Sequence, residues 1–595
     1  MVEPHPVLVD VVTRIQQRSQ QTRSAYLRLM QQMASGDVQR GKLSCSNSAH
    51  GVAVLSEDEK QRFIQQDWQN VGVVTAYNDM LSAHQPYHDY PEKIREILKA
   101  HNVSVQVAGG VPAMCDGVTQ GQPGMELSLF SRDTIARSTA IALSHQMFDA
   151  AVLLGICDKI VPGLLIGALQ FGHLPTVFLP SGPMPSGLSN PEKSRIRQAF
   201  AEGKVGESEL LDAEMQCYHS PGTCTFYGTA NSNQMLMEFM GLHLPGASFV
   251  NPGTAERDAF TQQALTLLAQ QMQAEQPIRL YEVINEYSLV NAVVGLLATG
   301  GSTNHTLHLV AIAKACGLVL TWQDFADLAQ VVPLIVRVYP NGVADVNTFH
   351  EQGGMETCMG ELLSAGLLFS DEGQVKTAFG IPFSEYGARR KPVAESNPVL
   401  RPVAAPFLPS SGLRVVSGNL GQAVVKTSAV DPEYWAIKAP ARVFQDQVSL
   451  KHAFQQGELT EDFVAVVRYQ GPCANGMPEL HQLMPIMSSL QDQGIRVALL
   501  TDGRLSGASG KVLAALHCTP EALQGEGLAR IHNGDLIELD AEHGVLHCDV
   551  PEAEWQQRIV SHPDHLQAAP LGVGRDLFSV LRSQCSDAST GATTF

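Results

Sequence analysis

The alternation of short apolar runs with helical segments is the feature that most constrains the fold of this chain. The runs at 71–77, 150–156 and 176–180 have the length and the Val, Leu and Ala content of buried strands. Segments with apolar residues at helical spacing, at 91–101 and 131–148, separate these runs. Strands that alternate with helices in this way predict an α/β fold with a largely parallel sheet.

A proline-rich stretch at 395–413 separates two parts of different character. It carries four prolines and little periodicity, so it is the predicted linker. Before it, residues 5–35 are predicted to form a helix that precedes the α/β pattern. After it, strand-like runs follow one another more densely. We therefore predict a large α/β domain over residues 1–404 and a smaller, β-rich domain over residues 405–595.

The net charge of −19 limits the partners that the chain is expected to have. So acidic a protein is not expected to bind nucleic acid or anionic membranes, although a local basic pocket would still admit an anionic substrate. No run approaches the roughly 20 apolar residues of a membrane helix. The apolar stretch near the N-terminus contains Asp10 and Arg14, which a secretory signal would not carry. A cytoplasmic location is therefore expected.

Eleven cysteines are scattered from Cys45 to Cys585, and none forms a Cys-x-x-Cys pair. This spacing argues against a zinc ribbon, and a long chain without a signal peptide argues against a disulfide framework. Most of these cysteines are expected to be small, buried apolar residues. A cysteine that binds a cofactor must therefore be identified from its local context.

The strongest local feature is Cys157-Asp158-Lys159, which ends the apolar run 150–156 and precedes a helix-like stretch. These side chains are expected at the carboxyl end of a buried strand, where open α/β sheets place ligands. A thiolate, a carboxylate and an amine side by side could bind a soft and a hard metal centre together. A cysteine that caps a strand beside a surface Asp–Lys pair is an equally good interpretation of the spacing alone.

Two glycine-rich loops offer further thiols. The loop 114–126 carries Cys115 and Asp116, and the loop 221–234 carries Cys224. Small neighbouring residues would let a cofactor approach these side chains closely. Taken alone, each loop is better explained as a tight turn with a buried thiol.

In the β-rich part, two loop edges carry polar side chains. Pro478 suits a first helical position, which would place Glu479 in the first turn of a helix. The next strand, 497–500, leads into a small-residue loop that contains Ser506 and ends at Lys511. Such a loop resembles an anion cradle with inward N–H groups, although it lacks the spacing of a Walker sequence. A sharp turn after a strand is the alternative.

The segment Gly300–Asn304 is predicted to open a helix. Ser, Thr and Asn are good N-cap residues, so plain capping is the expected role of these side chains. A helix N-terminus can also hold a carboxylate or a phosphate, which is the alternative role.

Together these segments resemble the dihydroxy-acid/phosphogluconate dehydratase family. CDKIVPGLLIGA and LLTDGRLSGAS are similar to its two signatures, and the other motifs follow in the family's order from about residue 40 to 580. The resemblance implies a large α/β N-terminal domain and a β-barrel-like C-terminal domain. It also implies a homodimer with the active site between the domains, near the dimer interface.

The resemblance assigns roles to individual residues. It implies an iron–sulfur cluster and a divalent cation, usually magnesium, and Ser506 matches the residue proposed as the catalytic base. The implied cluster ligands are Cys157 and Cys224, and the implied ligands of the cation are Asp116, Asp158, Lys159 (a carbamate in several members) and Glu479.

One departure from the family pattern concerns the third cluster ligand. Two-iron members take a further cysteine from a segment that corresponds to 75–87 here, where Ala83 stands in its place. This segment resembles instead the phosphogluconate branch, which carries a four-iron cluster. Cys115 is the preferred third thiolate because it precedes a metal-binding aspartate. Cys45 or a ligand other than cysteine are the alternatives.

The resemblance implies dehydration of a 2,3-dihydroxy acid, with 6-phosphogluconate as the expected substrate. Lys511 is the predicted phosphate contact, with His84 as the alternative. An unphosphorylated sugar acid or a branched dihydroxy acid is the alternative substrate, and Ala83 weighs against it. Other classes are less well supported, since an RNA-binding iron sensor would need a basic face and a P-loop kinase a Walker sequence.

Overall fold

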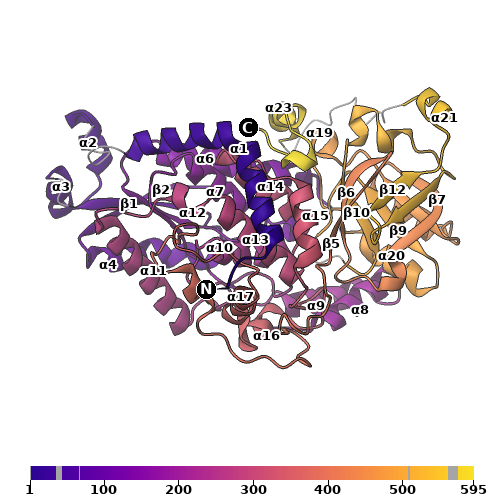
Figure 1. Cartoon of the computed structure of the whole chain (residues 1–595), viewed down its shortest axis with the longest axis horizontal. Helices are drawn as coiled ribbons and strands as arrows, with labels where there is room; N and C mark the ends of the chain where they lie inside the picture. The colour runs from indigo at the N-terminus through magenta and orange to yellow at the C-terminus, as the bar shows by residue number, and fades with distance from the viewer. Residues whose placement is uncertain (1, 35–42, 66–67, 507–509, 561–573) are drawn as a thin grey trace.

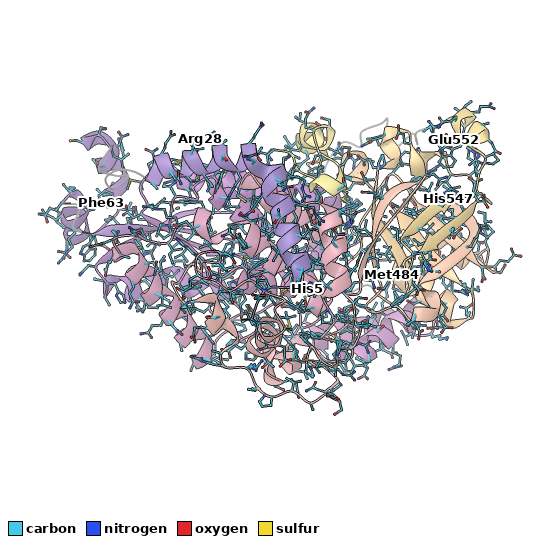
Figure 2. All side chains as sticks on the ribbon, in the orientation of Figure 1. His5, Arg28, Phe63, Met484, His547 and Glu552 are labelled. Atoms are coloured by element: carbon cyan, nitrogen blue, oxygen red, sulfur yellow. The ribbon has the colours of Figure 1, made fainter. Side chains whose placement is uncertain are left out.

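The computed structural model describes residues 2–34, 43–65, 68–506, 510–560 and 574–595. Figure 1 shows two parts side by side, a helix-rich part that contains a parallel sheet and a barrel formed by the later residues. Side chains fill the space that the ribbon leaves open between them (Figure 2). The predicted α/β class with a barrel-like C-terminal part is confirmed. Within the described residues, no helix is long and apolar enough to cross a membrane.

The sheet of the helix-rich part has the order β2-β1-β3-β4, and every strand pair in it is parallel. Its strands are β1 (Gln69–Thr75), β2 (Val103–Gly110), β3 (Ala150–Leu154) and β4 (Thr176–Phe178). All five residues of β3 are buried. Parallel strands buried on both faces have continuous apolar sequences, which is why the three predicted strands were visible in the sequence.

Helices surround this sheet, and three predicted helices are confirmed as α1 (Pro6–Ala34), α4 (Tyr90–Lys99) and α6 (Ser128–Leu143). Buried residues of α1 pack it against α13 and α15. The other helices of this part are α2 (Cys45–Val52), α3 (Glu57–Ile64), α5 (Asp116–Thr119), α7 (Ile160–Leu169), α8 (Asn190–Ala201), α9 (Glu207–Cys217), α10 (Thr229–Phe239), α11 (Ala255–Gln273), α12 (Leu280–Val283), α13 (Glu286–Thr299), α14 (His305–Ala315), α15 (Trp322–Val331), α16 (Val346–Glu351) and α17 (Gly354–Ser364).

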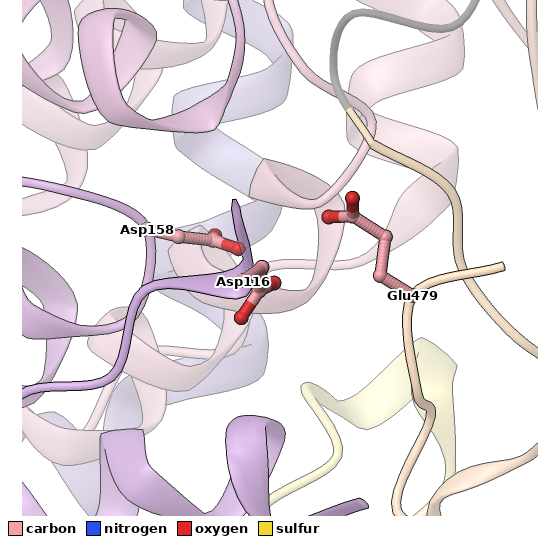
Figure 3. A group of neighbouring side chains, drawn as sticks. All are labelled: Asp116, Asp158 and Glu479. Carbon is pink, nitrogen blue, oxygen red and sulfur yellow. The ribbon is translucent and has the colours of Figure 1, made fainter. Parts of the chain in front are cut away.

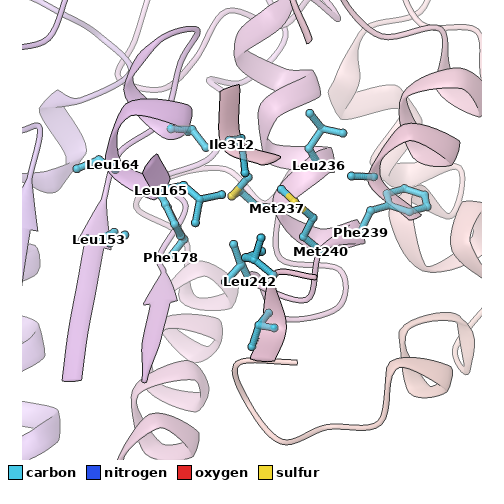
Figure 4. Packing of buried hydrophobic residues seen from close by; sticks show 14 of the residues in the cluster. Leu153, Leu164, Leu165, Phe178, Leu236, Met237, Phe239, Met240, Leu242 and Ile312 are labelled. Carbon is cyan, nitrogen blue, oxygen red and sulfur yellow. The ribbon is translucent and has the colours of Figure 1, made fainter. Parts of the chain in front are cut away.

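Helix α7 lies at the centre of the core, and all ten of its residues are buried. Its Leu164 and Leu165 lie among side chains of β3, β4 and α10 (Figure 4). A Cβ atom at Gly163 would lie 2.6 Å from the carbonyl oxygen of Arg132, so glycine allows α6 to approach this closely. A helix that is apolar all round must be buried, and this burial fixes the position of the turn that precedes α7.

The later part is a closed barrel of eight strands in the order β10-β6-β5-β12-β11-β7-β8-β9. An eight-stranded barrel is just wide enough for side chains to fill its interior. The strands are β5 (Leu413–Gly418), β6 (Gly421–Lys426), β7 (Ala436–Phe444), β8 (Phe463–Val467), β9 (Val497–Thr501), β10 (Leu513–Thr519), β11 (Leu536–Asp540) and β12 (Val545–Cys548). Its helices are α18 (Gln447–Gln455), α19 (Pro472–Asn475), α20 (Leu483–Asp492), α21 (Glu552–Gln557) and α23 (Ser579–Ser583).

The predicted linker contains no named helix or strand before β5, but it is attached to the helix-rich part. Leu400 and Leu408 form isolated bridges with Val336 and Leu334. The domain boundary predicted between residues 404 and 405 falls in this segment and stays a prediction.

The last residues of the sequence return from the barrel to α6. Arg132 of α6 donates hydrogen bonds to the carbonyl oxygens of Gly591, at 3.0 Å, and Ala592, at 2.7 Å. The backbone N–H of Thr594 donates to Asp133 at 2.8 Å. Because Arg132 is fully buried, these carbonyls are needed to satisfy its guanidinium group.

Candidate active site

The Cys157-Asp158-Lys159 turn joins β3 to α7 at the carboxyl end of the parallel sheet. Cys157 has a φ of +82°, a left-handed conformation that residues other than glycine rarely adopt. The side-chain amide of Asn233 donates to the carbonyl oxygens of Cys157, at 3.0 Å, and Asp158, at 2.8 Å. The strained turn is therefore held from α10, and strain of this kind is concentrated at functional sites.

Three cysteines from three different loops come together here. Cys115 directly precedes α5, and Cys224 lies in the loop before α10. The thiol of Cys157 donates a hydrogen bond to Cys115, which lowers the pKa of Cys115 to about 7 and raises that of Cys157 well above its usual value. Burial raises the pKa of Cys224 to about 12, and the charge of Cys115 adds to that shift. Three neighbouring sulfur atoms are a donor set that fits an iron–sulfur centre.

The segment that contains Ala83 lies against two of these thiol-bearing loops. Nε2 of His84 is 2.8 Å from the carbonyl oxygen of Ile156, which precedes Cys157. The carbonyl oxygen of Ser82 accepts a hydrogen bond from the N–H of Gly222 at 2.8 Å. Ala83 is buried there, but its methyl side chain has no atom that could bind iron.

Cys45, the alternative third thiolate, is exposed on α2, which lies at the edge of the helix-rich part in Figure 1. Cys115, in contrast, is hydrogen-bonded to Cys157. The described geometry therefore favours Cys115 over Cys45, although the cluster ligands stay a prediction.

Three buried carboxylates lie beside the thiols. Asp116, Asp158 and Glu479 each offer an oxygen atom within 4.8 Å of the others (Figure 3). The two aspartates come from the helix-rich part, and Glu479 comes from the barrel. Carboxylate oxygens are the ligands that magnesium prefers, so this group is a candidate site for a divalent cation.

The predicted helical position of Glu479 is wrong. Helix α20 begins only at Leu483, and Glu479 forms an isolated bridge with Arg504 instead. The N–H of Leu480 donates to the carbonyl oxygen of Arg504 at 3.1 Å. The loops that follow the parallel neighbours β8 and β9 thus pair with each other, and this pairing outweighs the local preference of Pro478 for a helix start.

Two buried cations compensate the charge of the three carboxylates. Nζ of Lys159 lies 2.5 Å from Asp116 and 2.6 Å from Asp158. The guanidinium of Arg504 lies 2.8 Å from Asp116 and 3.4 Å from Glu479. Three potential negative charges therefore face two positive ones. A further bound cation would balance the remaining negative charge.

The pKa values of the three acids are shifted in different directions by burial and by these neighbouring charges. Burial alone would raise the pKa of Asp116, but Arg504 and Lys159 outweigh burial and lower it. The pKa of Asp158 is lowered even further, mainly because Lys159 outweighs burial. Burial first, and the charge of Asp116 next, raise the pKa of Glu479 to about 7. A bound divalent cation would supply the missing positive charge and favour ionised Glu479.

Ser506 follows Arg504 and Leu505 and lines a small pocket with Thr303 and Lys426. The predicted anion cradle falls partly on residues 507–509, which lie outside the described residues. Lys511 is paired with Asp492 at 2.6 Å, and its side chain is 56% exposed. The other predicted phosphate contact, His84, is fully buried. In the described part of the chain, neither Lys511 nor His84 lines the pocket beside Ser506.

The predicted capping role of Gly300–Asn304 is confirmed only in part: α14 begins at His305, and the hydroxyl of Ser302 accepts a hydrogen bond from the N–H of Asn304 at 3.2 Å. Asn304 is the N-cap residue, but its side chain makes no capping hydrogen bond. It donates to Thr229 of α10 at 3.2 Å, and Ser302 lies 2.8 Å from the same hydroxyl. These side chains therefore attach the start of α14 to α10.

Three further side chains that contact the candidate site are not singled out by the sequence analysis. Arg504 contacts the carboxylates, Nε2 of His308 lies 3.2 Å from Asp158, and Lys426 lines the pocket beside Ser506. Arg504 and His308 lie within motifs that carry the family resemblance. Their presence in these motifs is the sequence signal that could have identified them as residues of the site. Lys426 also stands in such a motif, but only its burial distinguishes it from a surface lysine.

Arg504→Met should destabilise the metal-free protein by about 3–5 kcal/mol, because it leaves Asp116 and Glu479 buried with one cation fewer. Thermal unfolding in the presence of a chelator measures this effect. Lys511→Met is the matched control, since it removes only an exposed ion pair and should cost less than about 1 kcal/mol. Equal melting temperatures for the two variants would contradict a charge-compensating role of Arg504.

Comparison with known proteins identifies the family. Residues 69–380 match the model of the dihydroxy-acid/6-phosphogluconate dehydratase N-terminal domain, and residues 398–592 match that of its C-terminal domain. The chain belongs to the dihydroxy-acid/6-phosphogluconate dehydratase family, as the sequence motifs had indicated.

Individual members of this family differ in how similar their sequences are to this chain. Phosphogluconate dehydratase of Pseudomonas aeruginosa is 54% identical, over 99% of this chain and 98% of its own length. The enzyme of the same name from Zymomonas mobilis is 53% identical, over 100% of this chain and 98% of its own length. A dihydroxy-acid dehydratase of Thermus thermophilus is 33% identical, over 82% of this chain and 88% of its own length.

Proposed function

We propose that the protein is a hydro-lyase that dehydrates 6-phospho-D-gluconate to 2-dehydro-3-deoxy-6-phospho-D-gluconate and water, the dehydration step of the Entner–Doudoroff pathway. The observation that carries the proposal is the order of donors in two loops. Cys115 directly precedes Asp116, and Cys157 directly precedes Asp158. A thiol group and a carboxylate group therefore lie side by side, as a reaction that needs a soft and a hard centre at neighbouring atoms of one substrate requires.

The near full-length relatives support the choice of substrate. The two that are 53–54% identical are named phosphogluconate dehydratases. The relative named a dihydroxy-acid dehydratase is only 33% identical. Dehydration of a branched dihydroxy acid is the second candidate, and the lower identity makes it the weaker one.

The residues present fit both implied cofactors. Cys115, Cys157 and Cys224 would hold an iron–sulfur cluster, and the resemblance of residues 75–87 to the phosphogluconate branch favours a four-iron cluster over a two-iron one. Asp116, Asp158 and Glu479 would hold magnesium. When bound, the cluster would supply a Lewis acid for the departing hydroxyl group, and magnesium would stabilise negative charge at the substrate's carboxylate end.

Lys159 has a second proposed state. Its Nζ contacts Asp116 and Asp158, so it is within reach of a cation bound by these acids. As a carbamate it would carry an oxygen ligand and a negative charge instead of a positive one. Carbamate formation, in which the neutral amine adds CO2 and releases a proton, would therefore turn this side chain from a positively charged competitor of the cation into a ligand.

Ser506 is the proposed base. Dehydration removes the proton from C2 and expels the hydroxyl group from C3, and the resulting enol tautomerises to the 2-keto-3-deoxy acid. A free hydroxyl is a weak base, so Ser506 accepts the proton only when its own proton has been shifted away. Positive charge close to Ser506 favours that shift.

The assembly and the location of the protein belong to the same proposal. The protein is proposed to act as a cytoplasmic homodimer, with the active site near the dimer interface, and to have no nucleic acid or membrane partner. Its partner in the cell would be a small anionic sugar-acid phosphate.

An anaerobic assay of the purified protein tests the proposed function. With 6-phosphogluconate, gluconate and a branched 2,3-dihydroxy acid as substrates, 2-keto product should form fastest by far from 6-phosphogluconate. Equal kcat/KM on gluconate would move the assignment to an unphosphorylated sugar acid. Turnover of the branched acid alone would move it to the second candidate.

A further inference from the structure

Lys426, the last residue of β6, is a buried lysine whose amine has no partner among the described residues. Its side chain lines the small pocket beside Ser506, and the residue is only 8% exposed. Its Nζ makes no hydrogen bond within the part of the chain that the structure describes. Met484 of α20, labelled in Figure 2, lines the same pocket.

A buried amine without a counter-charge is unusual. Burial lowers the pKa of Lys426 to about 7, and no acid acts on it to reverse this. Lys159, in contrast, is a buried lysine of the site that lies between two carboxylates, which raise its pKa despite burial. Since burying an uncompensated cation is costly, Lys426 is suited to a negative charge that arrives with a ligand.

The second wall of this pocket is the start of α14. Thr303 lines the pocket, and α14 begins two residues later. A helix N-terminus attracts anions through its dipole, although here the N–H groups of His305 and Thr306 already donate to the carbonyl oxygens of Ser302 and Thr303. Lys426 thus adds its positive charge to a helix N-terminus whose dipole also favours an anion.

Asn341 connects these two walls rigidly. Its side-chain amide donates to the carbonyl oxygen of Gly300 at 2.8 Å. Its side-chain oxygen accepts a hydrogen bond from the hydroxyl of Ser428, two residues after Lys426, also at 2.8 Å. The end of β6 and the start of α14 are therefore held beside each other without a ligand.

We propose that Lys426 and Thr303 bind the phosphate group of the substrate, on the side of this pocket away from the hydroxyl of Ser506 that is proposed to act at C2. The inference rests on the proposed function and adds to it the residue that recognises the phosphorylated end. The carboxylate end is assigned elsewhere, since Asp116, Asp158 and Glu479 do not line this pocket. Lys426 takes the role that the sequence had suggested for Lys511, whose amine is already paired with Asp492 at the surface.

The first test compares kcat/KM for 6-phosphogluconate and gluconate in the wild type, Lys426→Met and Lys511→Met. Lys426→Met should lose about 100-fold or more in efficiency on 6-phosphogluconate relative to gluconate, because only the phosphorylated substrate loses a charged partner. Lys511→Met should behave like the wild type. An equal loss on both substrates would overturn the proposal and indicate that Lys426 assists Ser506 in proton transfer. Unchanged preference in Lys426→Met would also overturn it.

The second test does not depend on turnover. Inorganic phosphate should raise the melting temperature of the wild type and of Lys511→Met, but not that of Lys426→Met. In phosphate-free buffer, Lys426→Met should melt no lower than the wild type, since it replaces an unpaired buried amine by an apolar side chain. This result also establishes that the variant is folded. Equal stabilisation of all three proteins by phosphate would overturn the proposal.

The two tests separate this inference from the proposed function. If the wild type does not dehydrate 6-phosphogluconate although phosphate binds through Lys426, the proposed function fails and the anion site remains. If the wild type does dehydrate 6-phosphogluconate but Lys426→Met keeps its preference and its response to phosphate, only the role of Lys426 fails.

Discussion

Replacing Cys115, Cys157 or Cys224 by serine should abolish the brown iron–sulfur absorbance of the anaerobically purified protein, and its activity should fall to background. The three thiols come together from three loops, and the hydrogen bond between Cys115 and Cys157 places two of them in direct contact. Soft thiolates bind iron–sulfur clusters, whereas a serine hydroxyl is a hard and weakly acidic replacement. Iron and sulfide content, the visible spectrum and turnover of 6-phosphogluconate measure the loss.

Cys45→Ser is the matched control for these variants. Cys45 is exposed on α2, so this variant should keep its iron and its activity. Loss of the cluster in Cys45→Ser together with its retention in Cys115→Ser would make Cys45 the third ligand. Normal iron content and full turnover in Cys157→Ser or Cys224→Ser would remove the cluster from the proposed site.

Ser506→Ala should lower kcat by about 10²–10⁴-fold, the usual contribution of a general base, while cluster content and melting temperature stay at the wild-type values. The side chain lines the pocket next to Lys426, so its loss removes a proton acceptor without opening the core. Steady-state kinetics and the visible spectrum of the same preparation separate the two effects.

Lys511→Met serves as the control for the same loop, since it changes an exposed side chain and should leave kcat unchanged. If kcat of Ser506→Ala stays within about threefold of the wild type, Ser506 is not the base. A loss of cluster in Ser506→Ala would point to a structural role instead.

The parts of the fold that follow from local sequence were predictable. β3 and α7 are buried along their whole lengths, so each appears in the sequence as an uninterrupted apolar run. The polar turn between them could therefore be placed at the end of a strand. The closed barrel was expected from the family resemblance, because strand density alone does not reveal the order in which strands pair.

The parts of the site that depend on distant contacts were less predictable. The local pattern around Pro478 predicts a helix for Glu479, because it does not reveal the effect of Arg504, the partner of Glu479 in the bridge. Lys426 looks like an ordinary strand-end lysine, since burial without a partner is a property of the packed structure. Cys115 was favoured only from its neighbour Asp116, and its contact with Cys157 joins segments that the sequence does not relate.

The hydrogen bonds between Arg132 and residues 591–592 have a consequence for the order in which the site is assembled in a cell. The guanidinium and the carbonyl of Gly591 are 459 residues apart in the sequence. At a synthesis rate of about 5–20 residues per second, these carbonyls are synthesised roughly 20–90 seconds after Arg132. The hydrogen bond from Arg504 to Asp116 can likewise form only after another 388 residues have been synthesised. The acids of the site are therefore compensated by both cations only after residue 504 has left the ribosome, and Arg132 of α6 gains its carbonyl partners later still.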